Sequence, residues 1–548
     1  MTSENFDAWW RNAVVYQVYI RSFKDSDGDG VGDLEGLRSE LSYIANLGCD
    51  AIWLNPCYQS PQHDHGYDIA DYRSIDADYG TLEDFDALVC DAHRLGLRVV
   101  MDIVPNHCSS EHPWFQDALS TGNGSDARER FIFVDGYGEN GDSAPNAWKS
   151  VFGGSAWTRV SDGQWYLHSF DSEQPDFNWR SWQVRDEFES VLRFWFERGV
   201  DGFRIDVAHG LVKAGKIPRS GSHTSLSSEG MWDQPEVHDI YRRWRRIADE
   251  YNPPKYLVGE VWVRDPKRFA HYSATDELHQ AFSFDLLVQP WVAHRLRAAI
   301  EKGTSLSNGV DGPAWTLANH DVHRAVSRYG QEQYDQEPDA EDMLGAARRR
   351  DPVDIQLGIR RAKAAIGLVL ALPGTVYLYQ GEELGLPEVL ELPDECRQDP
   401  IWFRSTGKEY GRDGCRIPMP WTDLGQTCGF SPADASKPWL PQPEEYRSYN
   451  RDSQFDDPDS FLRLEQKMLR IRREYRSDID RIEWDESAPE GILLFGNGAF
   501  FCFVNANSQP YSLKSVDELG ELMMTTSSSS DDPSILAGNS TNWFKRLK

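Results

Sequence analysis

The feature that most constrains the fold is a series of short apolar runs that each end in an acidic or polar side chain followed by a loop. Four stand out: DIVPNH at 102–107, GFRID at 202–206, VGE at 258–260 and NHD at 319–321. Short runs rich in Val, Ile, Leu or Phe are typical of buried parallel strands. Because such strands deliver side chains from their carboxyl ends, we expect Asp206, Glu260 and Asp321 to meet in one site.

Strand-like runs alternate with amphipathic segments along most of the chain. The eight strand candidates are residues 14–20, 51–54, 98–104, 202–205, 256–258, 282–284, 315–317 and 376–379. Helix-like segments lie between most of them, for example at 82–95, 184–197 and 359–372. This alternation predicts an α/β fold, a closed (β/α)8 TIM barrel.

Two stretches interrupt this alternation. Residues 108–178 are rich in Gly, Ser, Asn and Trp with little periodicity, so we expect a small inserted domain after the third strand. Residues 471–548 contain short β-like runs such as ILLF and AFFCFVNA, which predict a C-terminal β-sandwich domain. The catalytic barrel is then assigned to residues 1–107 and 179–470.

The amino-acid composition limits the classes of molecule that the protein can bind. A net charge of −31 in 548 residues argues against binding of nucleic acid or anionic membrane and favours an uncharged ligand. No run of 18 apolar residues occurs, and the start MTSENFDAWW has no basic or apolar leader pattern. Eight cysteines without a CxxC pair fit reduced thiols. We therefore expect a cytoplasmic protein, whose oligomeric state the sequence leaves open.

The strand ends carry a specific acid–base pattern. Arg204 and Asp206 share one strand face, and a neighbouring guanidinium lowers the pKa of a carboxyl, as a nucleophile requires. Glu260 precedes the apolar Val261 and Trp262, surroundings that raise a carboxyl pKa and suit a general acid. Two carboxyls in opposite protonation states are what glycoside hydrolysis needs. The alternative is an ion pair and a strand-end Glu that serve stability only, and the DIVPNH and NHD motifs favour catalysis.

The motifs in this order resemble glycoside hydrolase family thirteen, the α-amylase family, and within it the α-glucosidase and oligo-1,6-glucosidase branch. The resemblance runs from WWRNAVVYQVYIRSF to the C-terminus and includes GYDIADY, QPDFNW, GFRIDVAH, VGEVW and YQGEELGLPEV. It implies that Asp206 is the nucleophile, that Glu260 is the acid/base, and that Asp321 holds the 2- and 3-hydroxyls of the distorted sugar. His107 and His320 would donate hydrogen bonds to the same glucose.

The same resemblance suggests how a substrate is held. In similar exo-acting enzymes an Asp and an Arg at the positions of Asp64 and Arg416 form a pair that grips the 4-hydroxyl of the terminal glucose. Such a pair would close one end of the pocket. Tyr67 would stack on the sugar. Phe152 and Phe170 are expected either to wall the pocket or to pack in the core.

The acidic segment DSDGDGVGD resembles the first nine positions of a calcium loop. The expected ligands are Asp25, Asp27, Asp29, the Val31 carbonyl and Asp33. The twelfth position is Gly36 rather than the bidentate Glu of an EF-hand, so we expect one structural Ca²⁺, with Mg²⁺ possible. The branch that the chain resembles carries calcium there; the alternative is a solvated acidic loop.

The sequence therefore predicts a retaining α-glucosidase that releases glucose from the non-reducing end of short, neutral α-glucosides, with maltose-type α-1,4 linkages favoured. Val207 is found in 1,6-acting members of the resembling branch, so an oligo-1,6-glucosidase stays open. A transglycosylating relative, such as a sucrose isomerase or trehalose synthase, is a further alternative. A non-catalytic, transporter-associated homologue would lack the acids and carry a transmembrane helix. No nucleotide or redox cofactor is implied.

Overall fold

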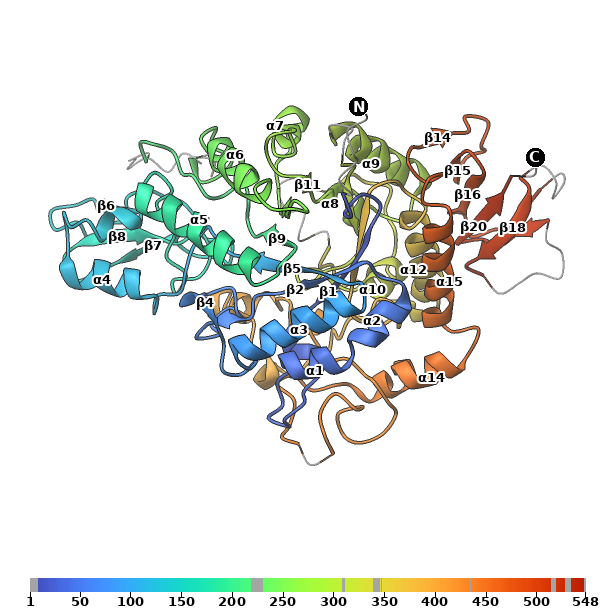
Figure 1. The fold of residues 1–548 in the computed structure, drawn as a ribbon, viewed down its shortest axis with the longest axis horizontal. Coiled ribbons are helices and arrows are strands. Elements are labelled where there is room, and N and C mark those ends of the chain that lie inside the picture. The colour runs from blue at the N-terminus through green and yellow to red at the C-terminus, as the bar shows by residue number, and fades with distance from the viewer. Residues whose placement is uncertain are drawn as a thin grey trace.

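A ring of eight parallel strands forms the centre of the computed structural model, with one β-rich part at each side (Figure 1). The structure describes residues 8–217, 230–307, 311–338, 345, 347–433, 435–513, 519–527 and 534–546. The ring strands are β1 (Val14–Val18), β2 (Ala51–Leu54), β5 (Arg98–Ile103), β9 (Gly202–Ile205), β10 (Tyr256–Gly259), β11 (Gln280–Ala281), β12 (Ala314–Thr316) and β13 (Thr375–Tyr379). This confirms the predicted α/β barrel.

The ring closes through its shortest strand. β1 pairs with β13, and a parallel bridge between Phe282 and Ala314 joins β11 to β12. The sixth strand was expected at residues 282–284, which is wrong by two residues, because helix α8 (Phe284–Leu287) begins there. Phe284 stacks on the Trp262 ring with centroids 4.3 Å apart and on the Phe282 ring with centroids 5.4 Å apart, and belongs to a buried apolar cluster.

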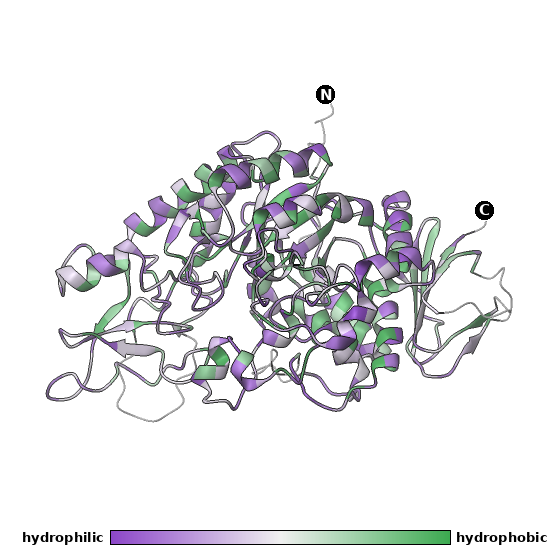
Figure 2. Cartoon of the chain, turned by 90° about the horizontal axis from the view of Figure 1, so that it is seen from below, coloured by the Kyte–Doolittle hydropathy of each residue, from purple (hydrophilic) through white to green (hydrophobic). Residues whose placement is uncertain are grey.

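Helices surround the ring and cover its outer face. They are α1 (Leu34–Ser39), α2 (Leu41–Leu47), α3 (Leu82–Arg94), α5 (Trp182–Glu197), α6 (Val237–Ala248), α7 (Pro266–His271), α9 (Ala293–Leu306), α10 (Ala325–Gly330) and α12 (Ile355–Val369). Thr81 and Asp84 form a capping box that fixes the start of α3. Figure 2 shows hydrophilic and hydrophobic residues along the same helices, as expected when one helix face packs on the strands.

The inserted stretch forms a small sheet of its own. Strands β6 (Phe133–Asp135), β8 (Gln164–Leu167) and β7 (Trp157–Arg159) pair antiparallel in that order, beside α4 (Pro113–Thr121). A short ribbon, β3 (Tyr58–Gln59) and β4 (Asp71–Ile75), lies after β2. The buried Lys213 Nζ lies 2.9 Å from Asp176 Oδ2 and 2.8 Å from Asn106 Oδ1, and so joins the insert to the loops after β5 and β9.

The C-terminal part is an antiparallel β domain. Its main sheet has the order β14 (Glu483–Trp484), β15 (Ile492–Asn497), β16 (Phe500–Asn505), β20 (Ser540–Lys545) and β18 (Glu521–Thr525). The smaller sheet of β17 (Tyr511–Ser512) and β19 (Ile535–Leu536) shares an apolar layer with it. Trp543 Nε1 donates to Gly367 O at 3.0 Å, which docks β20 on α12.

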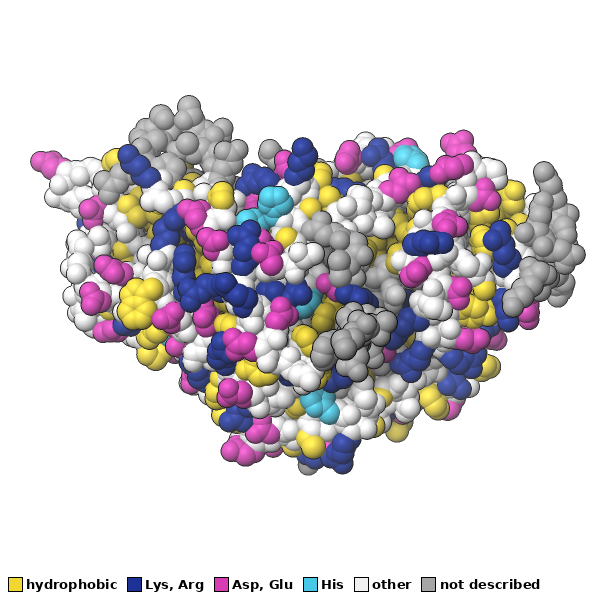
Figure 3. All heavy atoms as spheres, turned by 45° about the horizontal axis from the view of Figure 1, so that its top comes forward, with side chains coloured by type: hydrophobic (Ala, Val, Ile, Leu, Met, Phe, Trp, Pro, Cys, Tyr) yellow, Lys and Arg dark blue, Asp and Glu magenta, His cyan; other side chains and the backbone are white. Residues whose placement is uncertain are grey.

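Surface charge is mixed on the face that Figure 3 draws, where Asp and Glu side chains lie among Lys and Arg side chains. In the part of the chain that the structure describes, no helix has the length and apolarity that a membrane crossing demands. All eight cysteines are free thiols.

Helix α15 (Phe461–Glu474) lies between the barrel and the C-terminal sheet (Figure 1). Its Arg472 is buried and donates to the carbonyl oxygens of Leu370, Leu372 and Gly374 at 2.6, 2.8 and 2.6 Å. These carbonyls lie between α12 and β13, so one guanidinium joins the last barrel unit to the helix that precedes the C-terminal sheet.

Replacing Arg472 with Met should therefore leave three buried carbonyls without this donor. We expect the free energy of unfolding to fall by about 3–5 kcal/mol, measured by urea denaturation. Arg470→Met, on the exposed face of the same helix, should change it by no more than about 0.5 kcal/mol. Equal effects of the two substitutions would contradict this account of α15.

Candidate active site

One buried guanidinium connects three carboxyl groups at the ends of neighbouring strands. Arg204 Nη1 lies 2.9 Å from Asp102 Oδ1 and 2.6 Å from Asp206 Oδ1. Its Nη2 lies 2.6 Å from Glu260 Oε2. Asp102 comes from β5, Arg204 and Asp206 from β9 and the residue after it, and Glu260 directly follows β10. Asp206 and Glu260, the two predicted catalytic acids, therefore both contact the guanidinium of Arg204.

The protonation of Asp206 differs from the sequence expectation. Arg204 was expected to hold the pKa of Asp206 low. Instead burial raises the pKa of Asp206 well above its usual value, with Arg204 opposing and Glu260 and Asp102 adding to the rise. Burial likewise raises the pKa of Asp102 to about 6. The sequence shows the neighbouring arginine but neither the complete burial nor the additional acids that compete for it.

Glu260 is surrounded by hydrogen-bond donors, so the expectation of apolar surroundings is also wrong. Its Oε1 accepts from Trp262 Nε1 at 2.8 Å, and its Oε2 accepts from Val207 N at 3.1 Å as well as from Arg204. Val207 has φ 45°, a left-handed conformation that is costly for a β-branched residue. This conformation aims its N–H at Glu260.

Asp321 has the opposite electrostatic environment to Asp206. Its Oδ1 lies 3.2 Å from Arg412 Nη1 and 3.1 Å from Arg416 Nη2, and its Oδ2 lies 3.3 Å from His320 Nε2. Arg348 Nε donates to the Asp321 carbonyl at 2.7 Å. Although burial favours the neutral acid, these cationic neighbours and His320 hold the pKa of Asp321 well below its usual value. The site therefore keeps Asp321 ionised.

The arginine that pairs with Asp64 is Arg412, not the predicted Arg416. Arg412 Nη2 lies 2.6 Å from Asp64 Oδ1, whereas Arg416 donates through Nε to the His320 carbonyl at 2.8 Å and through Nη2 to Asp321. Both arginines belong to the motif GRDGCRIPMPW, and a 3-10 turn (Asp413–Cys415) separates them. That turn brings both guanidinium groups to one cluster, and sequence spacing cannot show which of them faces Asp64.

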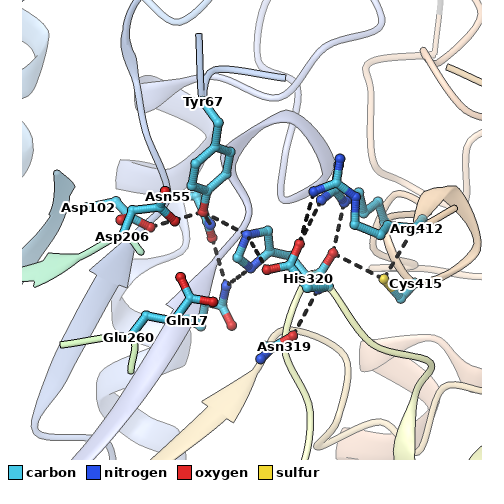
Figure 4. A network of polar contacts seen from close by, with 12 residues as sticks. Gln17, Asn55, Tyr67, Asp102, Asp206, Glu260, Asn319, His320, Arg412 and Cys415 are labelled. Carbon is cyan, nitrogen blue, oxygen red and sulfur yellow. Dashed lines mark hydrogen bonds and ion pairs between the residues drawn. The ribbon is translucent and has the colours of Figure 1, made fainter. Parts of the chain in front are cut away.

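Tyr67 and His320 form a stacked pair between the carboxyls around Arg204 and the cluster around Arg412 (Figure 4). Their rings are 5.2 Å apart with an interplanar angle of 6°, and Tyr67 Oη lies 2.7 Å from His320 Nε2 and 3.0 Å from Asp102 Oδ2. Burial lowers the pKa of His320 well below its usual value. Because the Gln17 amide donates to Nδ1 at 2.8 Å, the neutral ring carries its hydrogen on Nε2.

An aromatic wall connects the other predicted residues. The His107 and Phe170 rings are 5.1 Å apart, the Phe170 and Phe152 rings 5.4 Å, and the Arg412 guanidinium lies 5.1 Å from the Phe152 ring centroid. His107 Nε2 lies 3.1 Å from the Tyr67 carbonyl, and burial lowers the pKa of His107 to about 4. Both Phe side chains thus lie beside the charged cluster, next to the inserted sheet.

Several site residues were not singled out by the sequence analysis. They are Gln17, Asn55, Asp102, Trp262, Arg348, Asp399 and Arg412. Asp102 lies in the DIVPNH motif, four residues before the polar pair of Asn106 and His107, so the strand period could have placed it on the inner face. Arg348 and Asp399 lie in loops far from any strand end, and no local pattern marks them.

The acidic loop assembles three of its predicted ligands. Oxygens of Asp25, Asp27 and Asp29 all lie within 4.8 Å of one another, and carboxylate oxygens suit a hard cation such as Ca²⁺. Burial and the neighbouring carboxylates raise the pKa of Asp29. Asp33 is not part of this group; its oxygens accept from Gly36 N and Ser26 N, both at 2.7 Å, and cap α1. The Asp25 oxygens also accept from backbone N–H groups, at 2.7 and 3.0 Å, so Asp25 and Asp33 would each coordinate a metal while they accept hydrogen bonds.

The site has buried carboxyls at neighbouring strand ends with an arginine between them. A polar cluster with an aromatic wall lies beside them. This arrangement is typical of a barrel enzyme of the carboxylate-dependent hydrolase class. Comparison with known proteins gives the family. Residues 17–479 match the family described as alpha amylase, catalytic domain. The chain belongs to the α-amylase family and is a glycoside hydrolase, as the motifs predicted.

Relatives cover almost the whole chain. A probable alpha-glucosidase of Rhizobium meliloti is 36% identical over 91% of this chain and 90% of its own length. An oligo-1,6-glucosidase of Parageobacillus thermoglucosidasius is 33% identical over 85% and 84%. Among solved structures, the alpha-glucosyl transfer enzyme XgtA has a TM-score of 0.82 at 34% identity, covering 98% of this chain and 99% of its own. The trehalulose synthase MutB of Pseudomonas mesoacidophila has 0.84 at 28%, covering 98% and 99%.

Arg204 yields a pH prediction. Lys at this position keeps one positive charge but cannot bridge three carboxyls, so the pKa of Asp206 should rise further. Because the attacking carboxylate must be ionised, the fall of kcat/KM on acidification should begin about one pH unit or more higher in Arg204→Lys. Arg198→Lys, in a surface ion pair with Asp86, should leave the pH profile unchanged. An unmoved acid limb in Arg204→Lys would contradict the assignment.

Proposed function

We propose that the protein is a retaining, exo-acting α-glucosidase of the cytoplasm. It releases glucose from the non-reducing end of short neutral α-glucosides, with maltose-type α-1,4 linkages preferred. The observation that carries the proposal is the cluster of Asp64, Arg412 and Asp321 directly beside the acids held by Arg204. It places a polar, charged cluster next to Asp206 and Glu260, the two carboxyls needed for chemistry.

Chemistry would proceed in two displacements. Asp206 attacks the anomeric carbon while Glu260, carrying a proton, gives it to the departing glycosidic oxygen. Glu260 then removes a proton from water, which attacks the same carbon and frees Asp206 with net retention. The 2.6 Å contact from Arg204 stabilises Asp206 each time it is an ionised carboxylate.

Sugar binding would use the ionised and neutral groups that surround the acids. Asp321 accepts hydrogen bonds from the 2- and 3-hydroxyls, and the Nε2–H of His320 and the ring of His107 lie in the same cluster. Asp64 and Arg412 grip the 4-hydroxyl of the terminal glucose. The Phe152 ring lies 5.1 Å from the Arg412 guanidinium, beside this pair. We propose that the pair and this ring close the end of the site to a longer chain, which would make the action exo.

Transfer of glucose to a sugar instead of water is the second candidate. Two structural neighbours are named as an alpha-glucosyl transfer enzyme and a trehalulose synthase. Both outcomes share the glucosyl–Asp206 intermediate and differ only in the acceptor. Val207, next to that carboxyl, and the oligo-1,6-glucosidase relative keep α-1,6 hydrolysis open. Product analysis with maltose, isomaltose, sucrose and trehalose separates these outcomes.

We also propose that Asp25, Asp27 and Asp29, with the Val31 carbonyl and Asp33, hold one structural Ca²⁺. The support is the grouping of three carboxylates in a tight loop that precedes α1. A bound divalent cation would offset their mutual repulsion and stiffen the chain between β1 and α1. It takes no part in the chemistry.

The nucleophile can be tested by Asp206→Asn. This nearly isosteric change removes the attacking charge, so kcat/KM on 4-nitrophenyl α-glucoside should fall by about four orders of magnitude or more. Thermal melting should remain cooperative. Asp186→Asn, exposed on α5, should retain wild-type activity. More than a tenth of the wild-type rate in Asp206→Asn would refute the role.

The proposed function itself is tested by early products. Maltotriose should yield glucose and maltose first, the released glucose should be the α-anomer by proton NMR before mutarotation, and starch viscosity should fall slowly. β-Glucose as the first anomer would rule out the double displacement. Rapid loss of viscosity would rule out exo action.

Removal of the metal should affect stability and not chemistry. Chelation should lower the melting temperature, because the ion binds only the folded loop, while initial rates in a short assay stay the same. In Asp27→Asn the melting temperature should respond to added Ca²⁺ less than in wild type, and in Asp78→Asn, which replaces a carboxylate outside the predicted ligand set, as in wild type. An immediate, reversible loss of rate without unfolding would place the ion in the catalytic machinery instead.

A further inference from the structure

Asp399 is a fully buried carboxyl that the reaction above does not use. Its Oδ2 accepts from Arg412 N at 2.6 Å and from Arg412 Nε at 2.7 Å, and its Oδ1 lies 3.1 Å from Arg412 Nη2. The same Oδ1 accepts from Ile401 N at 2.9 Å. One carboxylate thus binds both the main chain and the side chain of a single arginine.

These contacts decide where the Arg412 guanidinium can point. Asp399 occupies Nε and one edge of Nη2, which fixes the plane of the group. In that plane Nη2 reaches Asp64 Oδ1 at 2.6 Å and Nη1 reaches Asp321 Oδ1 at 3.2 Å. Without Asp399, Arg412 would keep its two other carboxylates but lose the contacts that orient it.

Electrostatics supports the same role. Arg412 and Arg416 converge on one oxygen of Asp321, and their like charges repel each other. Arg412 outweighs burial and holds the pKa of Asp399 well below its usual value, so a negative charge lies directly against the Arg412 guanidinium. That charge offsets the crowding of the two arginines.

The surrounding backbone is shaped around this carboxyl. Gly411 has φ 68°, and a Cβ there would lie 2.6 Å from the Asp399 carboxyl carbon, so the chain passes directly against it. Asp399 is also the N-cap of α13 (Pro400–Arg404). At the other end of α13, Arg404 Nη2 donates to Gly153 O at 2.8 Å, beside the Phe152 wall. The short helix therefore connects Arg412 with the aromatic wall.

We propose that Asp399 is the positioning residue for Arg412 and that recognition of the 4-hydroxyl of the terminal glucose depends on it. The inference rests on the proposed exo-glucosidase function. Asp399 does not touch the sugar; it acts by orienting the guanidinium that does.

The test compares 4-nitrophenyl α-glucoside with its 4-deoxy analogue, which lacks the group that Arg412 would hold. In Asp399→Asn, kcat/KM on the glucoside should fall about tenfold or more, while kcat/KM on the 4-deoxy analogue should change by less than about threefold. Asp399→Ser, which keeps an N-cap oxygen for α13, should behave in the same way. Asp394→Asn, an exposed carboxyl in the same segment, should leave both substrates unaffected.

A double-mutant cycle separates positioning from general support. If Asp399 acts through Arg412, then adding Asp399→Asn to Arg412→Ala should cause no further loss on the glucoside. Additive losses, equal losses on both substrates, or unfolding of both Asp399 variants while Arg412→Ala still melts cooperatively would each overturn the proposal. A wild-type enzyme that does not distinguish the two substrates would instead refute the 4-hydroxyl pocket itself, and the cycle would still report whether the two residues are coupled.

Discussion

The site depends on the Arg204 guanidinium, which holds three carboxyl groups that could not otherwise share a buried space. Taking even one carboxylate out of water costs several kcal/mol, and Asp102, Asp206 and Glu260 also repel one another. Arg204 is almost fully buried and reaches all three because its planar fork directs Nη1 and Nη2 separately. Closed barrel geometry makes this possible, since β5, β9 and β10 are neighbours in the ring.

A second cluster of carboxylates and guanidinium groups lies next to the Arg204 cluster. Asp321, Asp64 and Asp399 surround Arg412, and Arg416 supports Asp321 from the other side. The two sets produce opposite results: burial dominates at Asp206 and raises its pKa, whereas the cations dominate at Asp321 and lower it. Asp321 therefore stays ionised, whereas Asp206 can attack only as the ionised carboxylate that the Arg204 contact stabilises.

Much of the fold was predictable from the sequence because strand length and apolar content are local properties. Seven barrel strands overlap their predicted ranges, and Asp206 and Glu260 meet on Arg204 as expected from strand-end chemistry, with Asp321 close enough to contribute to the raised pKa of Asp206. What the sequence could not show depends on tertiary contacts. The pKa of Asp206 follows from burial among other acids, Glu260 is bonded by Val207 N, and the partner of Asp64 follows from a 3-10 turn. Asp399 becomes visible only when its loop is packed against Arg412.

The central claim is that Asp206, held by Arg204, forms a covalent bond to glucose during turnover. The most direct measurement is mass spectrometry of the protein after incubation with 5-fluoro-α-glucosyl fluoride, a substrate whose glucosyl–enzyme intermediate breaks down slowly. The account predicts one fluoroglucosyl group per chain, and peptide mapping should locate it on Asp206. A label on another residue, or full turnover of a slow natural substrate with no covalent adduct at any time, would contradict it.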